Sequence, residues 1–246
     1  MDRLIYTAMT GASAAAYRQA VLSNNLANVS TNGFRAELST YRAVPVTGDG
    51  ATTRVMAVEA TPGFLDIPGS PQRTGRAMDA MTTGNSWFAV QGLDGTEAYT
   101  RNGSFEVAQD GTLKTNNGLT VLSDGGAPIT VPEGGEVTLG IDGTLSAKVG
   151  NQPPTGIGRL KLATPTAEDP LKRGGDGLFR TTSGEPMAND AAARVQLGVI
   201  EGSNVNAIET MVSMIQTARQ FEAQTRLMQT AEADDRAAAQ LLSIQG

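Results

Sequence analysis

The chain of 246 residues contains neither cysteine nor histidine. Without cysteine it has no disulfide, no thiolate ligand for a metal and no thiol nucleophile. Without histidine it lacks the commonest transition-metal ligand and the side chain that most often transfers protons near neutral pH. These two absences remove most familiar active sites, so we expect no enzyme activity, no metal and no cofactor.

Aromatic residues and long apolar runs are also scarce. Aromatics make up 4% of the chain and hydrophobic residues 39%, against 29 glycines, so a central core would be thin and rich in turns. No run of about 18 apolar residues is present, which argues against membrane insertion. The first residues show no secretory signal peptide. The formal net charge of -6 offers no basic patch for nucleic acid.

Each end of the chain instead carries a long helical pattern. Near the N-terminus, apolar and small residues recur at alternating steps of four and three, a period of about 3.5 that is typical of a coiled-coil seam. We expect this stripe to be an assembly interface made of Ile5, Ala8, Ala12, Ala15, Leu22, Leu26 and Val29. A second stripe near the C-terminus consists of Ile208, Met211, Ile215, Ala218, Phe221, Thr225, Met228 and Ala231.

Neither stripe is sufficient to hold its helix in isolation. A helix from about Asp2 to Asn28 would be roughly 40 Å long, yet its seam is rich in alanines, each of which buries little area at ~25 cal/mol per Å². Small seam residues favour close packing among several long helices, although an intramolecular pair on an ordinary domain is the alternative. Gln19 interrupts the first stripe, either as a register-fixing polar residue or as a surface residue.

The segments between the helices divide by composition. We expect an N-terminal helix and turn over 1–33, closed by asparagines and Gly33, and then an extended connector over 34–82 with one strand at Arg54–Val58. Residues 83–185 indicate an antiparallel β-rich domain, and 186–202 a return segment with a strand at Val195–Ile200. Residues 203–246 indicate a helix capped by Asn206, with Ser203 or Asn204 as alternative caps. The predicted fold is therefore mixed, with terminal α-helices in a coiled-coil or helical-bundle layer and a central β domain.

Short apolar runs separated by Asn-Gly and Asp-Gly pairs define the β domain. These pairs favour type I′ hairpin turns, in which both central residues have positive φ. The Asp-Gly pairs follow no calcium-loop spacing, and the acidic residues stand mostly in turns rather than as a catalytic pair. The expected strands are Trp87–Val90, Ala98–Thr100, Ser104–Val107, Thr112–Lys114, Thr120–Leu122, Ile129–Val131, Val137–Leu139, Thr144–Ala147 and Gly158–Leu162.

Three separated motifs of the chain match those of one known family. The first runs from Asn25 to Arg35 and reads NLANVSTNGFR; its matching positions include Asn25, Leu26, Ala27, Asn28, Thr31, Gly33 and Phe34. The second, Tyr99–Phe105 with Asp110–Leu113, is similar to the central hairpin of that family. The third is the approach to the last helix, where Glu201, Ser203, Asn204 and Val205 match. In all three motifs the chain resembles bacterial flagellar rod and hook proteins. Within that family, its N-terminal residues and Tyr41–Val46 most resemble a proximal rod subunit.

The resemblance implies a structural subunit that assembles helically through its terminal helices into the axial drive shaft and transmits torque. Its implied partners are copies of itself, homologous proximal and distal rod subunits and the flagellar export apparatus. Its implied location is the basal-body rod that spans the periplasm, reached without a cleaved signal peptide. The alternatives are a distal rod or hook subunit of the same family and, from another class, a periplasmic carbohydrate-cleaving enzyme.

Overall fold

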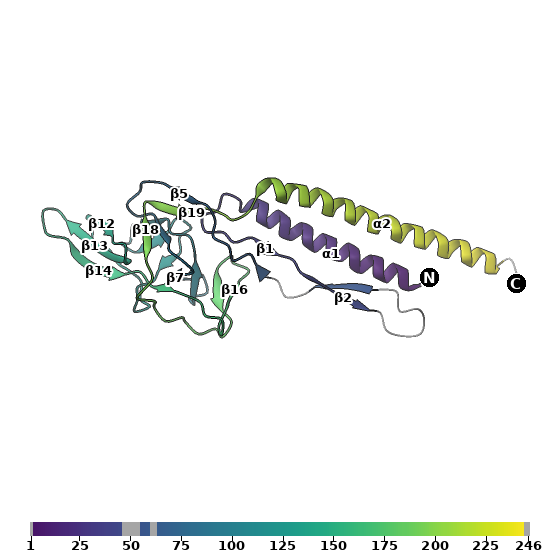
Figure 1. Ribbon diagram of the computed structural model, residues 1–246, viewed down its shortest axis with the longest axis horizontal. Helices are drawn as coiled ribbons and strands as arrows, with labels where there is room; N and C mark the ends of the chain where they lie inside the picture. The colour runs from purple at the N-terminus through teal and green to yellow at the C-terminus, as the bar shows by residue number, and fades with distance from the viewer. Residues whose placement is uncertain (1, 46–54, 60–62, 244–246) are drawn as a thin grey trace. The chain divides into compact units, whose positions relative to one another are not determined.

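The computed structural model describes residues 2–45, 55–59 and 63–243, which form helices α1 and α2 and strands β1 to β19 (Figure 1). Contacts between residues divide the chain into two compact units. The helical unit consists of Met1–Val29, Ala36–Leu65 and Val205–Gly246. The β unit consists of Ser30–Arg35 and Asp66–Asn204. The chain therefore passes from one unit to the other four times.

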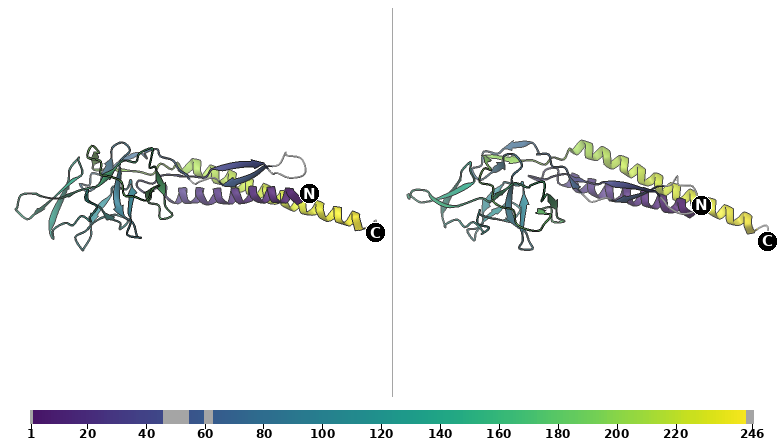
Figure 2. Two further views of the ribbon diagram at one scale, coloured as in Figure 1. Left: turned by 90° about the horizontal axis from the view of Figure 1, so that it is seen from below. Right: turned by 60° about the horizontal axis from the view of Figure 1, so that its bottom comes forward.

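Two long helices dominate the helical unit. Helices α1 (Asp2–Ala27) and α2 (Ala207–Ser243) lie side by side and run in opposite directions (Figures 1 and 2), which confirms the two predicted helices. Their approach is close, because a Cβ atom added to Gly11 of α1 would lie 3.0 Å from Cδ of Gln224 on α2. No helix within the described residues is long and apolar enough to cross a membrane.

The start of α2 is fixed by a side-chain cap. The Oδ1 atom of Asn206 accepts hydrogen bonds from the backbone N–H groups of Ile208 at 3.1 Å and Glu209 at 3.3 Å. These two donors have no partner inside the helix, so an asparagine in this position stabilises the first turn. The predicted cap at Asn206 is confirmed.

A β-hairpin packs along α1 in the helical unit. Its strands are β2 (Tyr41–Pro45) and β3 (Val55–Glu59), and β3 contains the described part of the strand predicted at Arg54–Val58, of which Arg54 lies outside the described residues. The Tyr41 hydroxyl donates to the carbonyl oxygen of Ala14 at 2.8 Å and ties the hairpin to the helix. A second pair of short strands, β1 (Glu37–Leu38) and β4 (Gly63–Phe64), was not predicted.

The β unit is built entirely from antiparallel pairs. Its largest sheet has eight strands in the order β16-β17-β8-β7-β11-β10-β9, with β15 also paired to β7. These strands are β7 (Trp87–Gln91), β8 (Glu97–Thr100), β9 (Phe105–Val107), β10 (Leu113–Thr115), β11 (Thr120–Val121), β15 (Leu162–Ala163), β16 (Leu171–Arg173) and β17 (Phe179–Thr181). A three-stranded sheet contains β12 (Gly135–Leu139), β13 (Thr144–Val149) and β14 (Thr155–Arg159).

Two further strand pairs join distant parts of the chain within the β unit. Strand β5 (Pro71–Arg73) pairs with β19 (Val199–Glu201), and β6 (Ala80–Thr82) pairs with β18 (Val195–Leu197). Residues from the second half of the predicted connector are therefore paired with the predicted return segment. The domain bounds inferred from the sequence differ from the two units in this respect, because pairing between residues so far apart leaves no local signal.

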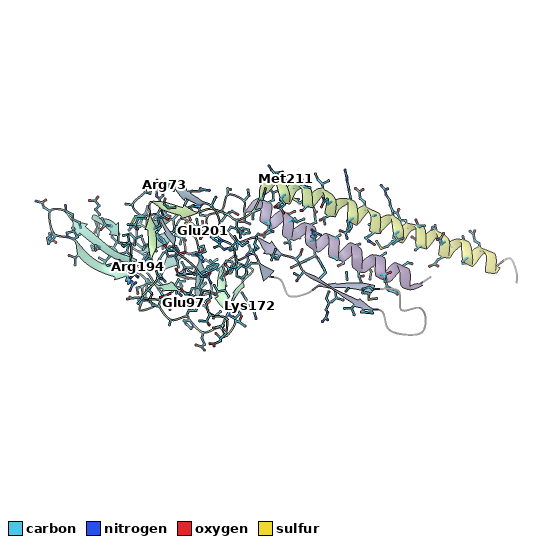
Figure 3. All side chains as sticks on the ribbon, in the orientation of Figure 1. Arg73, Glu97, Lys172, Arg194, Glu201 and Met211 are labelled. Atoms are coloured by element: carbon cyan, nitrogen blue, oxygen red, sulfur yellow. The ribbon has the colours of Figure 1, made fainter. Side chains whose placement is uncertain are left out.

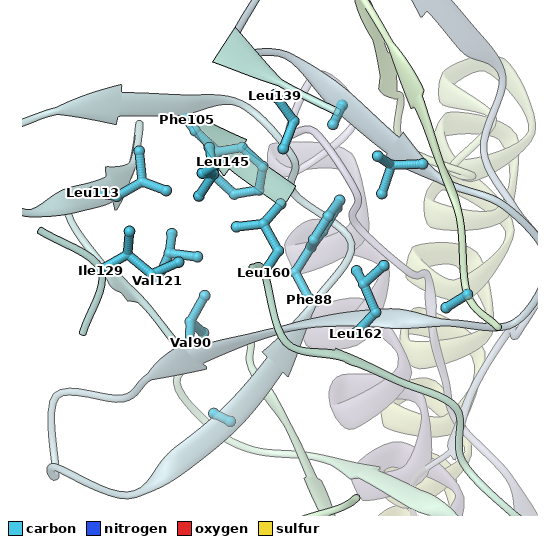
Figure 4. Packing of buried hydrophobic residues seen from close by; sticks show 14 of the residues in the cluster. Phe88, Val90, Phe105, Leu113, Val121, Ile129, Leu139, Leu145, Leu160 and Leu162 are labelled. Atoms are coloured by element: carbon cyan, nitrogen blue, oxygen red, sulfur yellow. The ribbon is translucent and has the colours of Figure 1, made fainter. Parts of the chain in front are cut away.

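One apolar cluster forms the core of the β unit (Figure 4). Its members are contributed by most strands of the large sheet and by the three-stranded sheet, and include Phe88, Val90, Phe105, Leu113, Val121, Ile129, Leu139, Leu145, Leu160 and Leu162. The rings of Phe88 and Phe105 meet edge to face with centroids 5.1 Å apart, a favourable arrangement for two aromatic side chains. The predicted strand Ile129–Val131 supplies core residues. Within these three described residues, however, the structure has only an isolated β-bridge from Thr130 and no strand.

The Asp-Gly turns have a geometry other than the one predicted. Within the described residues only glycines have positive φ, so Asp94, Asp110 and Asp142 are not in the left-handed region that a type I′ turn requires at both positions. Each aspartate instead accepts a hydrogen bond from the backbone N–H two residues later, at 2.9 to 3.1 Å. A type I turn followed by a left-handed glycine explains this pattern. The Asn102-Gly103 pair is not a hairpin turn; Gly103 instead lies close to Ala80 of another segment.

Candidate assembly interface

Helix α2 turns its largest apolar side chains toward solvent. Four of them near its start are exposed: Ile208 by 77%, Met211 by 50%, Val212 by 48% and Ile215 by 56%. Met211 lies on the side of α2 that faces away from α1 (Figure 3). We call these four residues the outer stripe. Three of them belong to the predicted C-terminal stripe. Its other members are exposed at Ala218 and Phe221, half-buried at Thr225 and Met228, and buried at Ala231.

The opposite side of α2 is polar or small. Thr210, Thr217 and Ala231 are buried, and half-buried Gln224 lies against Gly11 of α1. These four positions are seven residues apart, the spacing of one face of a helix in a pair. The hydroxyl groups of Thr210 and Thr217 donate to carbonyl oxygens one turn earlier, at 2.7 and 2.8 Å. The side of α2 that packs on α1 therefore offers little apolar area, whereas the outer stripe offers much more.

The predicted N-terminal stripe is largely covered inside the helical unit. Its three alanines, Ala8, Ala12 and Ala15, are buried. Its larger members are half-buried, namely Ile5, Leu22, Leu26 and Val29. Two apolar side chains outside the predicted stripe, Tyr6 and Met9, are each 51% exposed. The surface of α1 that is open for contacts thus differs from the surface that the periodicity indicated.

The first half of the N-terminal motif closes α1 onto strand β1. The buried Asn25 side chain donates through Nδ2 to the carbonyl oxygen of Glu37 at 2.9 Å and accepts from the Glu37 N–H at 2.8 Å. An asparagine amide offers one acceptor and two donors, so it can pair with both backbone groups of one residue. The Asn28 side chain donates to the carbonyl oxygen of Asn24 at 2.9 Å, and Leu26, Ala27 and Asn28 complete the helix end.

The second half of the motif is held inside the β unit, next to the C-terminal motif. Gly33 has a φ of 70° and its N–H donates to the carbonyl oxygen of Glu201 at 2.7 Å. Phe34 is buried, lies under the guanidinium of Arg173 at 4.7 Å, and accepts at its carbonyl oxygen from the Asn204 N–H at 3.2 Å. Thr31 accepts at its carbonyl oxygen from the Phe34 N–H. The two motifs, far apart in the sequence, therefore meet.

At this meeting point lies a buried group of charges that we call the Glu201 cluster: Arg35, Trp87, Arg101 and Glu201. Each of the four side chains is at most 3% exposed. Arg35 Nη1 donates to Glu201 Oε1, and Arg101 Nη1 lies 3.6 Å from Glu201 Oε2. Both guanidinium carbons lie over the ring of Trp87, at 5.7 Å for Arg35 and 4.8 Å for Arg101. Figure 3 labels Glu201 within the β unit.

The electrostatics of the cluster follow from its burial. Removal from water lowers the pKa of Arg101 to about 10, against the attraction of Glu201, which raises it, while the nearby charge of Arg35 lowers it further. The two terminal nitrogens of Arg101 donate to three polar groups: the Thr82 hydroxyl at 2.8 Å, the Gly84 carbonyl at 3.0 Å and the Asn85 amide oxygen at 3.2 Å. Its buried Nε atom has no hydrogen-bond partner. Removing a partner of a buried charge leaves that charge uncompensated, so we expect the loss of either Glu201 or Arg101 to destabilise the fold strongly.

Sequence reasoning included Glu201 among the motif residues but not Arg35, Trp87 or Arg101 among the site residues. Arg35 and Arg101 both stand inside segments that carried the family resemblance. Trp87 is the only tryptophan of the chain and is fully buried. It packs on Phe179 with ring centroids 4.6 Å apart and also contacts two arginines. The signal available was one arginine in each of two motifs, Arg35 at the end of the first and Arg101 within the second.

The remaining residues of the C-terminal motif tie it to the segment that follows the connector. Ser203, Asn204 and Val205 are half-buried, and the Asn204 amide donates to the carbonyl oxygen of Ile67 at 2.9 Å. Gly69 donates its N–H to Glu201 Oε1 at 3.0 Å. Across the described part of the chain, no group of three or more acidic residues is arranged to hold a metal ion.

Comparison with known proteins places these motifs in one family. Family models match residues 5–35 (flagella basal body rod protein), 81–147 (flagellar hook protein FlgE/F/G D1 domain) and 196–241 (flagellar basal body rod FlgEFG protein C-terminal). The flagellar basal-body rod proteins FlgF of Salmonella typhimurium and of Escherichia coli are each 44% identical over 99% of this chain and all of their own length. FlgG of Buchnera aphidicola subsp. Schizaphis graminum is 31% identical over 93% of this chain and 95% of its own. The chain belongs to the family of flagellar basal-body rod proteins.

Proposed function

We propose that this chain is a non-enzymatic structural subunit of the proximal part of the flagellar rod. In this proposal residues 1–33 and 203–246 form the inner tube as a coiled-coil or bundle layer with neighbouring subunits. The connector over 34–82, the β-rich segment 83–185 and the return over 186–202 form the rest of the subunit. The neighbours are copies of the chain and homologous rod subunits, and the assembled tube transmits torque.

The outer stripe of α2 carries the proposal. A helix that packs on a partner ordinarily buries its large apolar residues and exposes its polar ones. Helix α2 does the reverse toward α1, since Thr210, Thr217 and Gln224 lie on the inner side and Ile208, Met211 and Ile215 face solvent. Contiguous exposed apolar surface marks an interaction site on a protein. A neighbouring helix of the same family supplies a covering surface of suitable chemistry.

Head-to-tail contacts that do not close produce helical filaments, and in such a contact the outer stripe of one subunit meets a different surface of the next. We infer that Ile5, Leu22, Leu26 and Val29, which are half-buried, complete the contact from α1. The N-terminal alanines allow the helix axes to approach closely. The apolar area that each subunit lacks internally is thereby supplied by its neighbours.

The identity values favour the proximal rod over the alternatives within the family. The two relatives at 44% identity are both named FlgF. Other relatives named FlgF are 28 to 33% identical, and relatives named FlgG are 30 to 31% identical. A distal rod or hook subunit is the second candidate. Labelling the subunit in purified basal bodies and locating it by electron microscopy distinguishes them, since a label on the distal segment or the hook contradicts a proximal position.

Localisation and export follow from the same proposal. A subunit of the rod has to cross the inner membrane and reach the periplasm, and we propose that it does so through the flagellar export apparatus without cleavage. The measurement is the mass of the subunit recovered from purified basal bodies. A mass short of the full translated chain at its N-terminus would contradict export without processing.

The interface is tested by the double substitution Met211→Glu with Ile215→Glu. Placing two charges on the outer stripe makes its burial against an apolar neighbour costly, since an unpaired buried charge is strongly unfavourable. We expect the variant to be absent from basal bodies and the cells to be non-motile, in a strain lacking the wild-type chain. The matched control is Gln216→Glu, an exposed position that points roughly 100° away around the helix.

Folding of the variant is checked separately by the fluorescence of Trp87, which lies in the β unit and far along the sequence from α2. Loss of assembly with native Trp87 emission supports the interface. Incorporation and motility equal to those of the Gln216→Glu control would show that the outer stripe is not an assembly surface.

A further inference from the structure

The chain enters and leaves the β unit through two segments that are bonded to each other. It first enters at Ser30 and finally leaves at Asn204. Between these points the Gly33 N–H donates to the carbonyl oxygen of Glu201 at 2.7 Å, and the Asn204 N–H donates to the carbonyl oxygen of Phe34 at 3.2 Å. Arg35 and Glu201 add a buried ion pair between the same two segments. The first and last parts of the β unit are thus directly connected.

A third segment is fastened to the same carboxylate. Glu201 Oε1 accepts from the Gly69 N–H at 3.0 Å, Ser70 accepts at its carbonyl oxygen from the Gly202 N–H at 3.0 Å, and Asn204 reaches Ile67. This segment begins where the chain returns to the β unit at Asp66. Each segment by which the chain enters the β unit, at Ser30 and at Asp66, therefore bonds to Glu201 or to a residue a few positions from it.

The backbones approach so closely here that only glycine fits. A Cβ atom on Gly69 would lie 1.9 Å from the carbonyl oxygen of Gly202, and one on Gly33 would lie 2.4 Å from the carbonyl carbon of Arg101. Real Cβ atoms do not occupy such positions, so the crossing requires glycine at both places. The buried arginines Arg35 and Arg101 fill the space beside the crossing.

We propose that Glu201 holds the first and last segments of the β unit together, so that a pulling force along the chain does not unfold the strands between them. Because Arg35 and Glu201 are 166 positions apart in the sequence, their bond closes a loop that contains nearly the whole β unit. Tension entering at Ser30 passes directly to the segment that leaves at Asn204 and does not reach the strands inside the loop. The inference goes beyond the proposed function and does not depend on any contact between subunits.

The geometry suits this role because the fastenings break together. The Gly33 bond to Glu201, the Asn204 bond to Phe34 and the Arg35–Glu201 ion pair all join the same two segments, 30–35 and 201–204, within a short length of chain. Bonds loaded in parallel share a force, whereas bonds loaded one after another fail in sequence. Burial adds to the resistance, since opening the cluster leaves charges that lost their partner inside a low-dielectric site.

The test is single-molecule pulling on the full chain held by its two termini. In the wild type we expect the helices to extend first and the β unit to resist until one event releases the closed loop. That event should add the length of 166 residues, about 550 to 600 Å at about 3.3 to 3.6 Å per residue. In Glu201→Gln, which keeps the side-chain shape and removes its charge, we expect this opening to be at least about tenfold faster at equal force.

The matched control is Glu97→Gln, the same change in another buried ion pair of the β unit. Glu97 lies 2.7 Å from Lys161, and the two side chains are 11% and 9% exposed. Because this pair lies inside the closed loop, its loss should leave the opening force unchanged. Equal opening rates in the two variants, or a wild-type β unit that unravels in several small steps from its ends, would overturn the proposal.

A milder variant guards against misfolding of Glu201→Gln, whose thermal unfolding is followed by circular dichroism before pulling. Asn204→Ala removes one fastening at a half-buried position, the bond to the Ile67 carbonyl. We expect its opening rate to lie between those of the wild type and Glu201→Gln. An opening rate equal to that of the wild type would contradict a shared load. Because the measurement uses isolated molecules, its result is independent of whether the chain assembles into a rod.

Discussion

The two units of this chain reach stability by different means. The β unit buries a continuous set of large aliphatic and aromatic residues and adds a buried charge cluster at the point where its ends meet. The helical unit buries alanines, threonines and a glycine contact, and leaves large apolar residues exposed on α2. Burial of large side chains contributes most of the stability of a fold. The β unit therefore has an apolar core of its own, whereas the helical unit leaves large apolar side chains of α2 exposed.

The largest expected effect comes from one substitution made in both units. Leu145→Ala removes a side chain that is 0% exposed in the β core, and Leu227→Ala removes one that is 41% exposed on α2. The first should lower the free energy of unfolding of the β unit by about 2 to 5 kcal/mol, and the second should change stability by about 0.5 kcal/mol or less. Denaturant unfolding followed by Trp87 fluorescence and circular dichroism measures both. Equal losses would remove the distinction between the two units.

A smaller effect tests whether the two backbone segments that meet at Gly69 and Gly202, next to Glu201, are packed as tightly as the β core. Gly69→Ala places a methyl group 1.9 Å from the Gly202 carbonyl oxygen, whereas Gly175→Ala in a surface turn meets no atom within 4 Å. We expect the first variant to lose about 1 to 3 kcal/mol of stability, because backbone has to move to admit the methyl group. The second should be close to neutral or slightly stabilising. A tolerated alanine at Gly69 would mean that the segments at the crossing are loosely held.

The smallest effect concerns acid and the turns of the β unit. Hydrogen bonds from Thr112 and Lys114 lower the pKa of Asp110 to about 2, and bonds from Thr96 and Thr144 lower the pKa values of Asp94 and Asp142 from their usual 3.8. Because the folded-state pKa is depressed, this stabilisation is present above about pH 4 and is lost as the pH falls toward 2.

The prediction is that the β unit becomes easier to unfold between pH 4 and pH 2, as measured by the denaturant midpoint of the Trp87 signal. The control is Asp110→Asn, which keeps the turn acceptor but does not titrate, and should show a smaller change over this range. An identical pH dependence in the wild type and in Asp110→Asn would show that the Asp110 turn does not contribute.

The elements with local signals were predictable from the sequence. The period of the terminal segments gave both helices, Asn206 gave the cap of α2, and the alternation of apolar runs with Asp-Gly pairs gave most strands of the β unit. Turn type was predicted wrongly for Asp94, Asp110 and Asp142, because a type I turn with a following left-handed glycine uses the same residue pair.

What depended on contacts between distant segments was not predictable. The pairing of β5 with β19 and of β6 with β18 joins residues more than a hundred positions apart, and neither Pro71–Arg73 nor Ala80–Thr82 has a strand pattern of its own. The face of α2 that packs on α1 was also missed, since Thr210, Thr217 and Gln224 are polar and hydrophobic periodicity selected the outer stripe. The assembly role of the predicted stripes stays a prediction.

The bond between Arg35 and Glu201 also sets an order of events during synthesis. Its two residues are 166 positions apart, so the carboxylate leaves the ribosome long after the arginine. Until then Ser30–Arg35 has no Glu201 to bind, and the cost of closing so long a loop is met only once the intervening strands have formed. In a nascent chain truncated before residue 201, the segment that follows the N-terminal helix therefore lacks its bonds to Glu201. These bonds form only once about the last fifth of the protein is being synthesised.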